Sequence, residues 1–187
     1  MKKRRVSSNF TIYLKGIART GWMQRGVPKE LAESVAEHSF ESAVIAFELS
    51  SFLAKKGTKI NAERAAVVAL IHDLHEVVTG DLPRWTSQRV DKKRIEILAS
   101  REFSEEIEKL LLEYMLQNSI EAKVAYISDK LSTFIQARHY YNLGIKEVKE
   151  IMRTARIEII KMIQKEERLK NLRENHLVKL VYKGKRL

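Results

Sequence analysis

The chain of 187 residues is predicted to be all-α and to fold as one compact helical bundle. Its apolar residues recur at the spacing of a helix, and no stretch alternates apolar and polar residues for long enough to form a sheet. Signals that begin or end helices recur along the chain, and only Pro28 and Pro83 interrupt the backbone. Because no Pro-, Gly- or Ser-rich linker divides the chain, we expect a single domain over residues 1–187.

The first half is predicted to hold three helices. Apolar residues at i, i+3, i+4 and i+7 mark an amphipathic helix from Phe10 to Ile17. Ser34 and Glu37 have the spacing of a capping box, so a second helix should begin near residue 35 and run to about residue 57. Asn61 can cap a third helix, which we expect to end at Gly80 because glycine tolerates the positive φ that often follows a helix.

The second half continues with helices near residues 91–103, 105–116 and 120–142. After Gly144, apolar residues at helical spacing predict one long amphipathic helix over about residues 145–175. Residues 176–187 are expected to form a basic tail, within which residues 178–182 could be extended.

The net charge of +11 is concentrated at the two ends of the chain. Residues 6–175 carry only +3, and the remaining charge comes from Lys2, Lys3, Arg4, Arg5, Lys179, Lys183, Lys185 and Arg186. Basic ends of this kind are more often solvated than bound to a polyanion, and the body lacks a nucleic-acid-binding motif. We therefore expect no nucleic-acid partner beyond a weak contact through these tails.

The absence of cysteine excludes disulfides, thiolate metal sites and a cysteine nucleophile, so any metal must be bound by His and carboxylates. Charges interrupt the apolar runs well short of a membrane span. No apolar segment follows the basic N-terminus, so a secretory signal is not expected. The chain is predicted to be soluble and cytoplasmic.

The adjacent pair His72-Asp73 lies in an apolar helical run, His38 lies in a second run and Asp129 in a third. Burying these polar groups is costly unless something binds their lone pairs. A divalent metal held by three separated helices would do so, and imidazoles with carboxylates suit borderline ions such as Mn, Co, Ni or Zn.

Two more acids belong to the same stretch. Glu76 lies four residues after His72 and three after Asp73, so on one helix all three would face the same side. Asp81 follows Gly80, where the chain changes direction and a side chain can turn back over the site.

Each residue also has a simpler interpretation when taken alone. His38 could be a hydrogen-bonded interior histidine, Asp129 a helix N-cap, and Glu76 half of a surface ion pair. Arg19 could be a solvated charge, and Trp22 could simply pack in the core. A metal site is favoured because all of these His and Asp residues occur together, each within an apolar helical run.

The ordered pattern His38, His72-Asp73 and Asp129 resembles the HD-domain superfamily of metal-dependent phosphohydrolases. Its 5′-deoxynucleotidase branch is more similar still, through the segments RTGW at 19–22, ESVAEHS at 33–39, HDLHE at 72–76 and GD at 80–81. The resemblance covers about residues 10–142 and implies a helical bundle of the HD-domain type. The predicted helix after Gly144 lies outside these motifs.

The resemblance implies a role for each matching residue. The metal ligands would be His38, His72, Asp73 and Asp129. The catalytic residues would be Glu76, which orients or deprotonates water, and Asp81. Arg19 would hold the substrate phosphate, and Trp22 would contact the sugar. In the bacterial branch the tryptophan directly follows the arginine, whereas here Thr20 and Gly21 separate them, so the preference for deoxyribose stays open.

The predicted function is removal of the 5′-phosphate from (deoxy)ribonucleoside monophosphates with one divalent metal ion as cofactor. A triphosphohydrolase, a cyclic-nucleotide phosphodiesterase and a non-catalytic nucleotide- or RNA-binding module are the alternatives. A homodimer is expected, with the helix over residues 145–175 as one possible contact.

Overall fold

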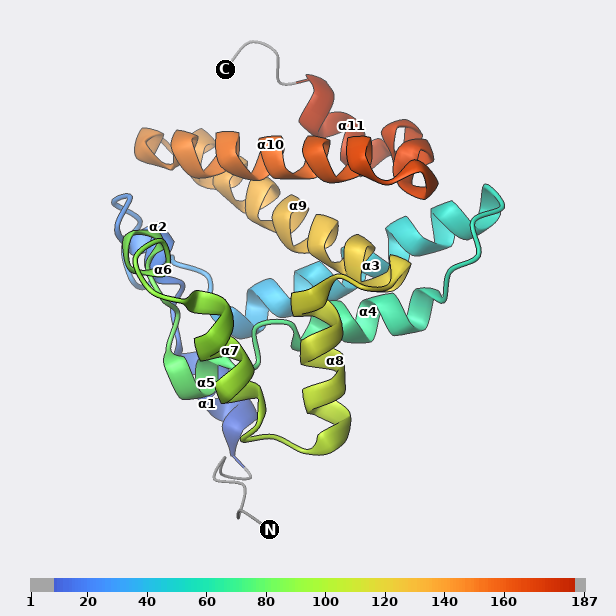
Figure 1. Ribbon diagram of the computed structural model, residues 1–187. Coiled ribbons are helices and arrows are strands. Elements are labelled where there is room, and N and C mark those ends of the chain that lie inside the picture. The colour runs from blue at the N-terminus through green and yellow to red at the C-terminus, as the bar shows by residue number, and fades with distance from the viewer. Residues whose placement is uncertain (1–8, 184–187) are drawn as a thin grey trace.

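A computed structural model describes residues 9–183, and within this span the regular structure is helical, which confirms the all-α prediction (Figure 1). One isolated antiparallel bridge joins Ala18 to Ser34. The helices are α1 (Phe10–Gly16), α2 (Thr20–Met23), α3 (Val35–Lys55), α4 (Ala62–Ile71), α5 (Glu76–Thr79), α6 (Arg84–Ser87), α7 (Lys92–Ser100), α8 (Glu105–Leu116), α9 (Ile120–Asn142), η1 (Lys146–Val148), α10 (Lys149–Lys165), η2 (Glu167–Glu174) and α11 (His176–Lys183).

Helix α9 lies at the centre of the fold, where α3, α4 and α10 all pack against it (Figure 1). Its sequence is buried on most sides, and the main core includes Ile127, Leu131 and Phe134 from this helix. A helix that is buried nearly all round is a core helix rather than a surface one. Asp129 lies in the middle of this helix and is therefore inside the protein, whereas Arg138 and His139 near its end are exposed.

Several helices begin where the sequence predicted. The Ser34 side chain accepts a hydrogen bond from the backbone N–H of Glu37 at 3.2 Å, and the Glu37 carboxylate accepts one from the backbone N–H of Ser34 at 2.6 Å. This reciprocal pair is the expected capping box. Asn61 caps α4 through its side-chain oxygen, which accepts a hydrogen bond from the backbone N–H of Arg64, and Gly80 has the positive φ, 68°, that was expected after a helix end.

The single helix predicted from Asn61 to Gly80 is wrong, because the chain forms α4, a turn over residues 72–75, and then the short α5. In the turn, Leu74 donates its backbone N–H to Ile71, and Glu76 donates to Asp73. These bonds span three residues instead of four and tighten the backbone. His72 and Glu76 therefore do not share one straight helix face.

The single helix predicted over residues 145–175 is also wrong, because α10 ends at Lys165 and η2 follows. Glu166 between them has an extended backbone, with φ −114° and ψ 111°. Its carboxylate binds Lys123 of α9 at 2.5 Å and Arg168 at 2.8 Å, which fixes the bend on the core. The apolar face of α10 lies against α9 and buries Met152, Ala155, Ile159 and Ile163, so this face is not open to a second protomer.

Residues 176–183 form helix α11, which corrects both the basic tail predicted from residue 176 and the possible extended segment at 178–182. Val178 and Val181 are both buried. Residues three apart face the same side of a helix but opposite sides of a strand, which explains why the helix forms. Lys179 and Lys183 belong to this helix, whereas Lys2, Lys3, Arg4, Arg5, Lys185 and Arg186 lie outside the described residues.

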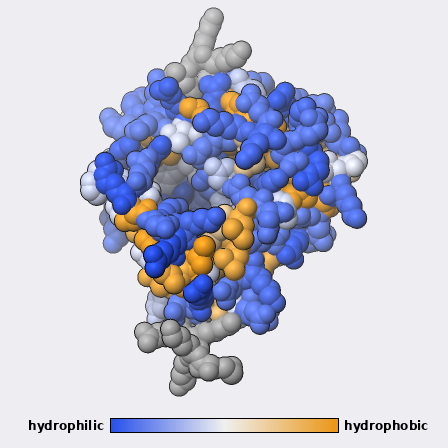
Figure 2. All heavy atoms as spheres, viewed as in Figure 1, coloured by the Kyte–Doolittle hydropathy of each residue, from blue (hydrophilic) through white to orange (hydrophobic). Residues whose placement is uncertain are grey.

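The surface is mostly hydrophilic in the view of Figure 2, with smaller hydrophobic patches among the charged residues. Among the described residues, no helix is both long enough and apolar enough to cross a bilayer.

Candidate active site

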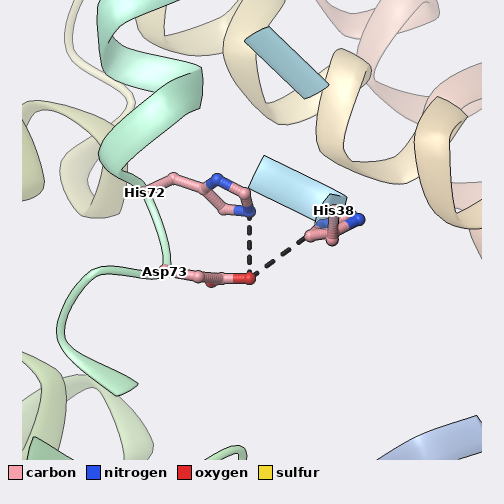
Figure 3. A group of neighbouring side chains, drawn as sticks. All are labelled: His38, His72 and Asp73. Carbon is pink, nitrogen blue, oxygen red and sulfur yellow. Dashed lines mark ion pairs between the residues drawn. The ribbon is translucent and has the colours of Figure 1, made fainter. Parts of the chain in front are cut away.

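The four predicted metal ligands come together from separate parts of the chain. His38 comes from α3, His72 from the end of α4, Asp73 from the turn that follows, and Asp129 from α9. Both imidazoles turn toward Asp73, as Figure 3 shows for His38 and His72. One ligand atom of each of these three residues lies within 4.8 Å of the others, so the group could hold a metal ion.

The distances place carboxylate oxygens against imidazole nitrogens. His72 Nε2 lies 3.1 Å from Asp73 Oδ2 and 3.9 Å from Asp129 Oδ1. His38 Nε2 lies 3.2 Å from Asp129 Oδ1 and 3.9 Å from Asp73 Oδ2. Each imidazole Nε2 therefore has an oxygen of Asp73 and an oxygen of Asp129 within 3.9 Å, and we call these four residues the His-Asp cluster.

The hydrogen bonding of His72 fits a cation at this point. Its Nδ1 donates to the backbone oxygen of Ala69 at 2.6 Å, so a neutral ring carries a lone pair on Nε2. That Nε2 is buried and has no hydrogen-bond partner, although Asp73 Oδ2 is close enough to count as an ion pair. Two acceptors that face each other in a buried space need a proton or a metal ion between them. Without a metal, Asp73 outweighs the effect of burial and raises the pKa of His72, which favours the proton; a divalent ion would take the place of that proton.

Asp129 is held so that one oxygen remains available to the cluster. Tyr114 donates its hydroxyl to Asp129 Oδ2 at 2.6 Å, and the Lys130 ammonium lies 2.8 Å from the same oxygen. Burial alone would raise the pKa of Asp129, but Lys130 and the neighbouring imidazoles hold it well below its ordinary value. Tyr114 could not be identified from the sequence, because it belongs to an amphipathic helix and reaches Asp129 only when α8 packs near α9.

Arg19 lies beside the His-Asp cluster and is mostly buried. Its Nη1 contacts Glu33 Oε1 at 3.0 Å, Thr133 Oγ1 at 3.3 Å and His38 Nδ1 at 3.0 Å. Its backbone N–H donates to the Glu33 oxygen next to the Ala18–Ser34 bridge. The bridge therefore fixes this segment to the start of α3 and places the guanidinium at the site. Burial and the contact with Arg19 lower the pKa of His38 and keep its ring neutral.

Trp22 is 2% exposed and makes mainly structural contacts. Its Nε1 donates to Glu33 Oε1 at 2.8 Å, and its ring packs edge-on against Tyr140 at 5.3 Å. Glu33 thus joins Trp22 to Arg19. The indole also lines the cavity beside Arg19.

Glu76 is the first residue of α5 and is almost completely buried. Its Oε2 has no hydrogen-bond partner, and Asp73, His75 and Glu76 bring ligand atoms within 4.8 Å of one another. Burial and the nearby carboxylates of Asp73 and Asp81 raise the pKa of Glu76. Perturbed and unpartnered acids of this kind are typical of functional sites.

Asp81 lies on the loop after Gly80 and ties this loop to the Arg19 segment. Its carboxylate accepts a short hydrogen bond from the backbone N–H of Thr20, and its backbone oxygen accepts one from the Thr20 hydroxyl at 3.1 Å. The structure therefore brings Asp81 and Arg19 to the same cavity, as the sequence pattern suggested.

This cavity of about 380 Å³ is lined by Arg19, Asp81, Lys130 and Thr133. It lies beside the His-Asp cluster because Arg19 contacts His38 and Lys130 contacts Asp129. Its far wall comes from α10, through Ile151, Thr154 and Glu158. The predicted motifs ended before this helix, so its contribution was missed. A larger groove of about 870 Å³ runs along α3 past Phe40, and neither Arg19 nor Lys130 lines it.

The sequence profile of the HD domain matches residues 13–173. A 5′-deoxynucleotidase HDDC2 from Bos taurus is 33% identical over 142 residues, which cover 71% of this chain and 65% of the relative. The chain thus matches about two thirds of that relative's length. The solved structure of a conserved hypothetical protein from Pyrococcus furiosus is 34% identical, with a TM-score of 0.83 over 93% of this chain and 96% of the other.

A protein of known structure from Pyrococcus horikoshii OT3 is 33% identical, with a TM-score of 0.79 over 91% of this chain and 96% of the other. The profile match includes α10, so the similarity extends beyond the motifs quoted from the sequence. With its buried His-Asp cluster and this match over most of its length, the chain belongs to the HD-domain family.

Proposed function

We propose that the chain is a metal-dependent 5′-deoxynucleotidase, which hydrolyses (deoxy)ribonucleoside monophosphates to nucleosides and phosphate. The observation that carries the proposal is the buried His-Asp cluster with its unpartnered His72 Nε2, next to a cavity lined by Arg19 and Lys130. The names of relatives from cattle, human and fission yeast, all called 5′-deoxynucleotidases, support this substrate class.

In this proposal His38, His72, Asp73 and Asp129 hold one divalent ion. When bound, such an ion supplies Lewis acidity and lowers the pKa of water near it. The two imidazoles and two carboxylates suit Co, Mn, Ni or Zn, because these borderline ions accept both nitrogen and oxygen ligands.

Arg19 and Lys130 provide the positive charge that a phosphate dianion needs. The contacts of Arg19 described above all use Nη1, so its Nε and Nη2 hydrogens can be directed at phosphate oxygens. Lys130 lines the same cavity and has its pKa raised to a value that keeps it charged, because Asp129 and Glu158 outweigh the effect of burial. Together they favour a substrate with a terminal phosphate.

Glu76 and Asp81 would handle the protons. Glu76 Oε2 is unpartnered and can accept a proton from the attacking water, which typically contributes on the order of 10²–10⁴-fold to the rate. Asp81, held by Thr20 at the cavity, would pass this proton from Glu76 on to the departing 5′-oxygen of the nucleoside and would be ionised again at the end of the step. The overall reaction converts water and a nucleoside monophosphate into a nucleoside and inorganic phosphate.

The direct test is phosphate release from a panel of ribo- and deoxynucleoside monophosphates, with metal-free protein and with added Co²⁺, Mn²⁺, Ni²⁺ or Zn²⁺. We expect release only with metal. No release from any nucleotide by folded, metal-loaded protein would overturn the proposal. The same assay with nucleoside triphosphates and cyclic nucleotides separates the alternatives, because triphosphate as a product would indicate a triphosphohydrolase and ring opening a phosphodiesterase.

A homodimer and a cytoplasmic location complete the proposal. Because the apolar face of α10 packs on α9, a second protomer would have to use another surface. The molar mass measured by light scattering would distinguish a monomer of 21.7 kDa from a dimer.

A further inference from the structure

The outer face of α3 carries an exposed apolar stripe. Phe40, Val44 and Phe47 are 67%, 55% and 48% exposed. Their spacing of i, i+4 and i+7 places them on one face of the helix. No other helix within residues 9–183 exposes three large hydrophobic side chains. Single exposed hydrophobic residues are ordinary, but a contiguous group of them marks an interaction surface.

Helix α4 widens this stripe into a patch. Val68 and Ala69 of α4 share a small core with Ala46 of α3 and with residues of α9, so α3 and α4 lie side by side on α9. Val67 and Leu70 of α4 are exposed on the side of the helix away from that core. We call the exposed residues of both helices the α3–α4 patch, which consists of Phe40, Val44, Phe47, Val67 and Leu70.

The area of the α3–α4 patch matches what a dimer needs. Its five side chains, each about half exposed, present on the order of 400–500 Å² of apolar surface. One side of a standard protein–protein interface buries about 800 Å², of which somewhat more than half is apolar. The patch therefore supplies the apolar part of one such interface.

The patch is also complementary in shape to a second copy of itself. A two-fold axis pairs the same surface of both copies, and an axis perpendicular to a helix makes the paired helices antiparallel. With the axis beside Ala43 and Val44, Phe40 of each copy lies opposite Phe47 of the other. The short side chain of Ala43 at the axis allows the two helices to approach closely.

The charges along α3 favour the same antiparallel arrangement. Glu37 and Glu41 lie near the start of the helix, and Lys55 and Lys56 lie at its end. An antiparallel copy sets the acidic start of one α3 against the basic end of the other, whereas a parallel copy would oppose like charges. Charge complementarity therefore points to a second copy of this chain as the occupant.

We propose that the α3–α4 patch is the contact between two copies of this chain, in which α3 crosses α3 antiparallel about a two-fold axis near Val44. The inference identifies the surface of the homodimer proposed above and does not depend on metal binding or catalysis. Among the described residues, those that line the cavity beside Arg19 come from neither α3 nor α4. This dimer would therefore leave that cavity open.

The first measurement is the molar mass of folded variants. Light scattering should give twice 21.7 kDa for the wild type. Phe40→Glu and Phe47→Glu should each weaken the dimer about 10³-fold, because loss of a central aromatic anchor costs about 30-fold and the symmetry repeats the loss. Leu143→Glu is the matched control, since Leu143 is 59% exposed but lies outside the patch, and it should stay dimeric. Circular dichroism checks that each variant keeps its helices.

The second measurement uses the absence of cysteine from the chain, because a single introduced thiol can form a disulfide only with its own copy. Val44→Cys should give a disulfide-linked dimer under mild oxidation, since residue 44 lies beside the axis. Phe40→Cys and Phe47→Cys, which lie away from the axis, should link more when the two proteins are mixed than when either is alone. Leu143→Cys should not link.

A monomeric wild type would overturn the inference and assign the patch to a different partner. A dimer that persists in both glutamate variants, or a Val44→Cys protein that links no better than Leu143→Cys, would place the dimer contact elsewhere and also overturn it. Nucleotide hydrolysis is a separate readout. A dimer with these properties that releases no phosphate would count against the proposed function and leave the interface standing.

Discussion

Glu76 has an environment that favours its protonated form in the metal-free protein. It is buried, its Oε2 lacks a partner, and Asp73 and Asp81 lie near enough to raise its pKa. A carboxylic acid whose pKa is higher in the folded than in the unfolded state loses folding stability as pH rises above the unfolded value. At neutral pH the Glu76 side chain therefore destabilises the metal-free fold. The same burial that causes this destabilisation places the carboxyl group where it could accept a proton from water.

We predict that Glu76→Gln lowers the turnover rate by about 10²–10⁴-fold while metal binding is retained. The same change should raise the melting temperature of the metal-free protein at pH 7, by about 2–4 °C for each kcal/mol recovered, because an uncharged amide replaces the acid. Calorimetry and metal titration of the variant check both parts. Glu48→Gln on the surface of α3 is the control, and full activity of Glu76→Gln would remove the assigned role.

A second residue-scale prediction concerns pH. The rate of the metal-loaded enzyme should rise with pH through the pKa of Glu76, because only its ionised form accepts a proton. Asp81→Asn removes one of the neighbouring negative charges that raise this pKa. The acidic side of the pH–rate profile should then move to lower pH, even though the overall rate falls. An unmoved acidic limb would show that another group controls it.

At the scale of the elements, the sequence predicted the starts of helices better than their ends. Ser34, Asn61, Ser104 and Ser119 all cap helices through their side chains, and such local bonds are visible in sequence. The break at His72-Asp73 and the bend at Glu166 depend on tertiary contacts, with the His-Asp cluster and with Lys123 of α9 respectively. Helical periodicity continues through both positions, so the pattern alone could not locate them.

Helix α10 shows why the site was only partly predictable. The motifs predicted which residues of α3, α4 and α9 would meet, and they meet within hydrogen-bond or ion-pair distance. The wall formed by Thr154 and Glu158, and the contact of Tyr114 with Asp129, arise only from packing between helices. Their residue types are common on any helix and carried no signal.

Packing of α10 can be tested directly. Ile159→Ala should destabilise the protein by about 2–5 kcal/mol, because Ile159 is completely buried against the core. Ile157→Ala on the same helix, where the side chain is 40% exposed, should have a much smaller effect. Chemical denaturation of both variants measures the difference. Equal stabilities would mean that α10 is only loosely attached and does not form a fixed cavity wall.

At the scale of the whole molecule, the metal should act as a stabilising ligand. A bound ion at a free concentration about 100 times its dissociation constant adds about 2.7 kcal/mol to folding stability. For a chain of this size the melting temperature should rise by about 5–10 °C. His72→Ala should lose most of this increase, since it removes a proposed ligand. Identical shifts in both proteins would indicate binding elsewhere.

The wide spacing of the His-Asp cluster along the chain has a consequence for biogenesis. His38 and Asp129 are 91 positions apart, and they become neighbours only when α3 and α9 have docked. A nascent polypeptide that has not yet acquired this topology offers isolated, weak donors to an ion. Metal binding is therefore expected late in folding, after the interior has assembled. An ion that met the chain earlier would find the ligands of the His-Asp cluster still apart.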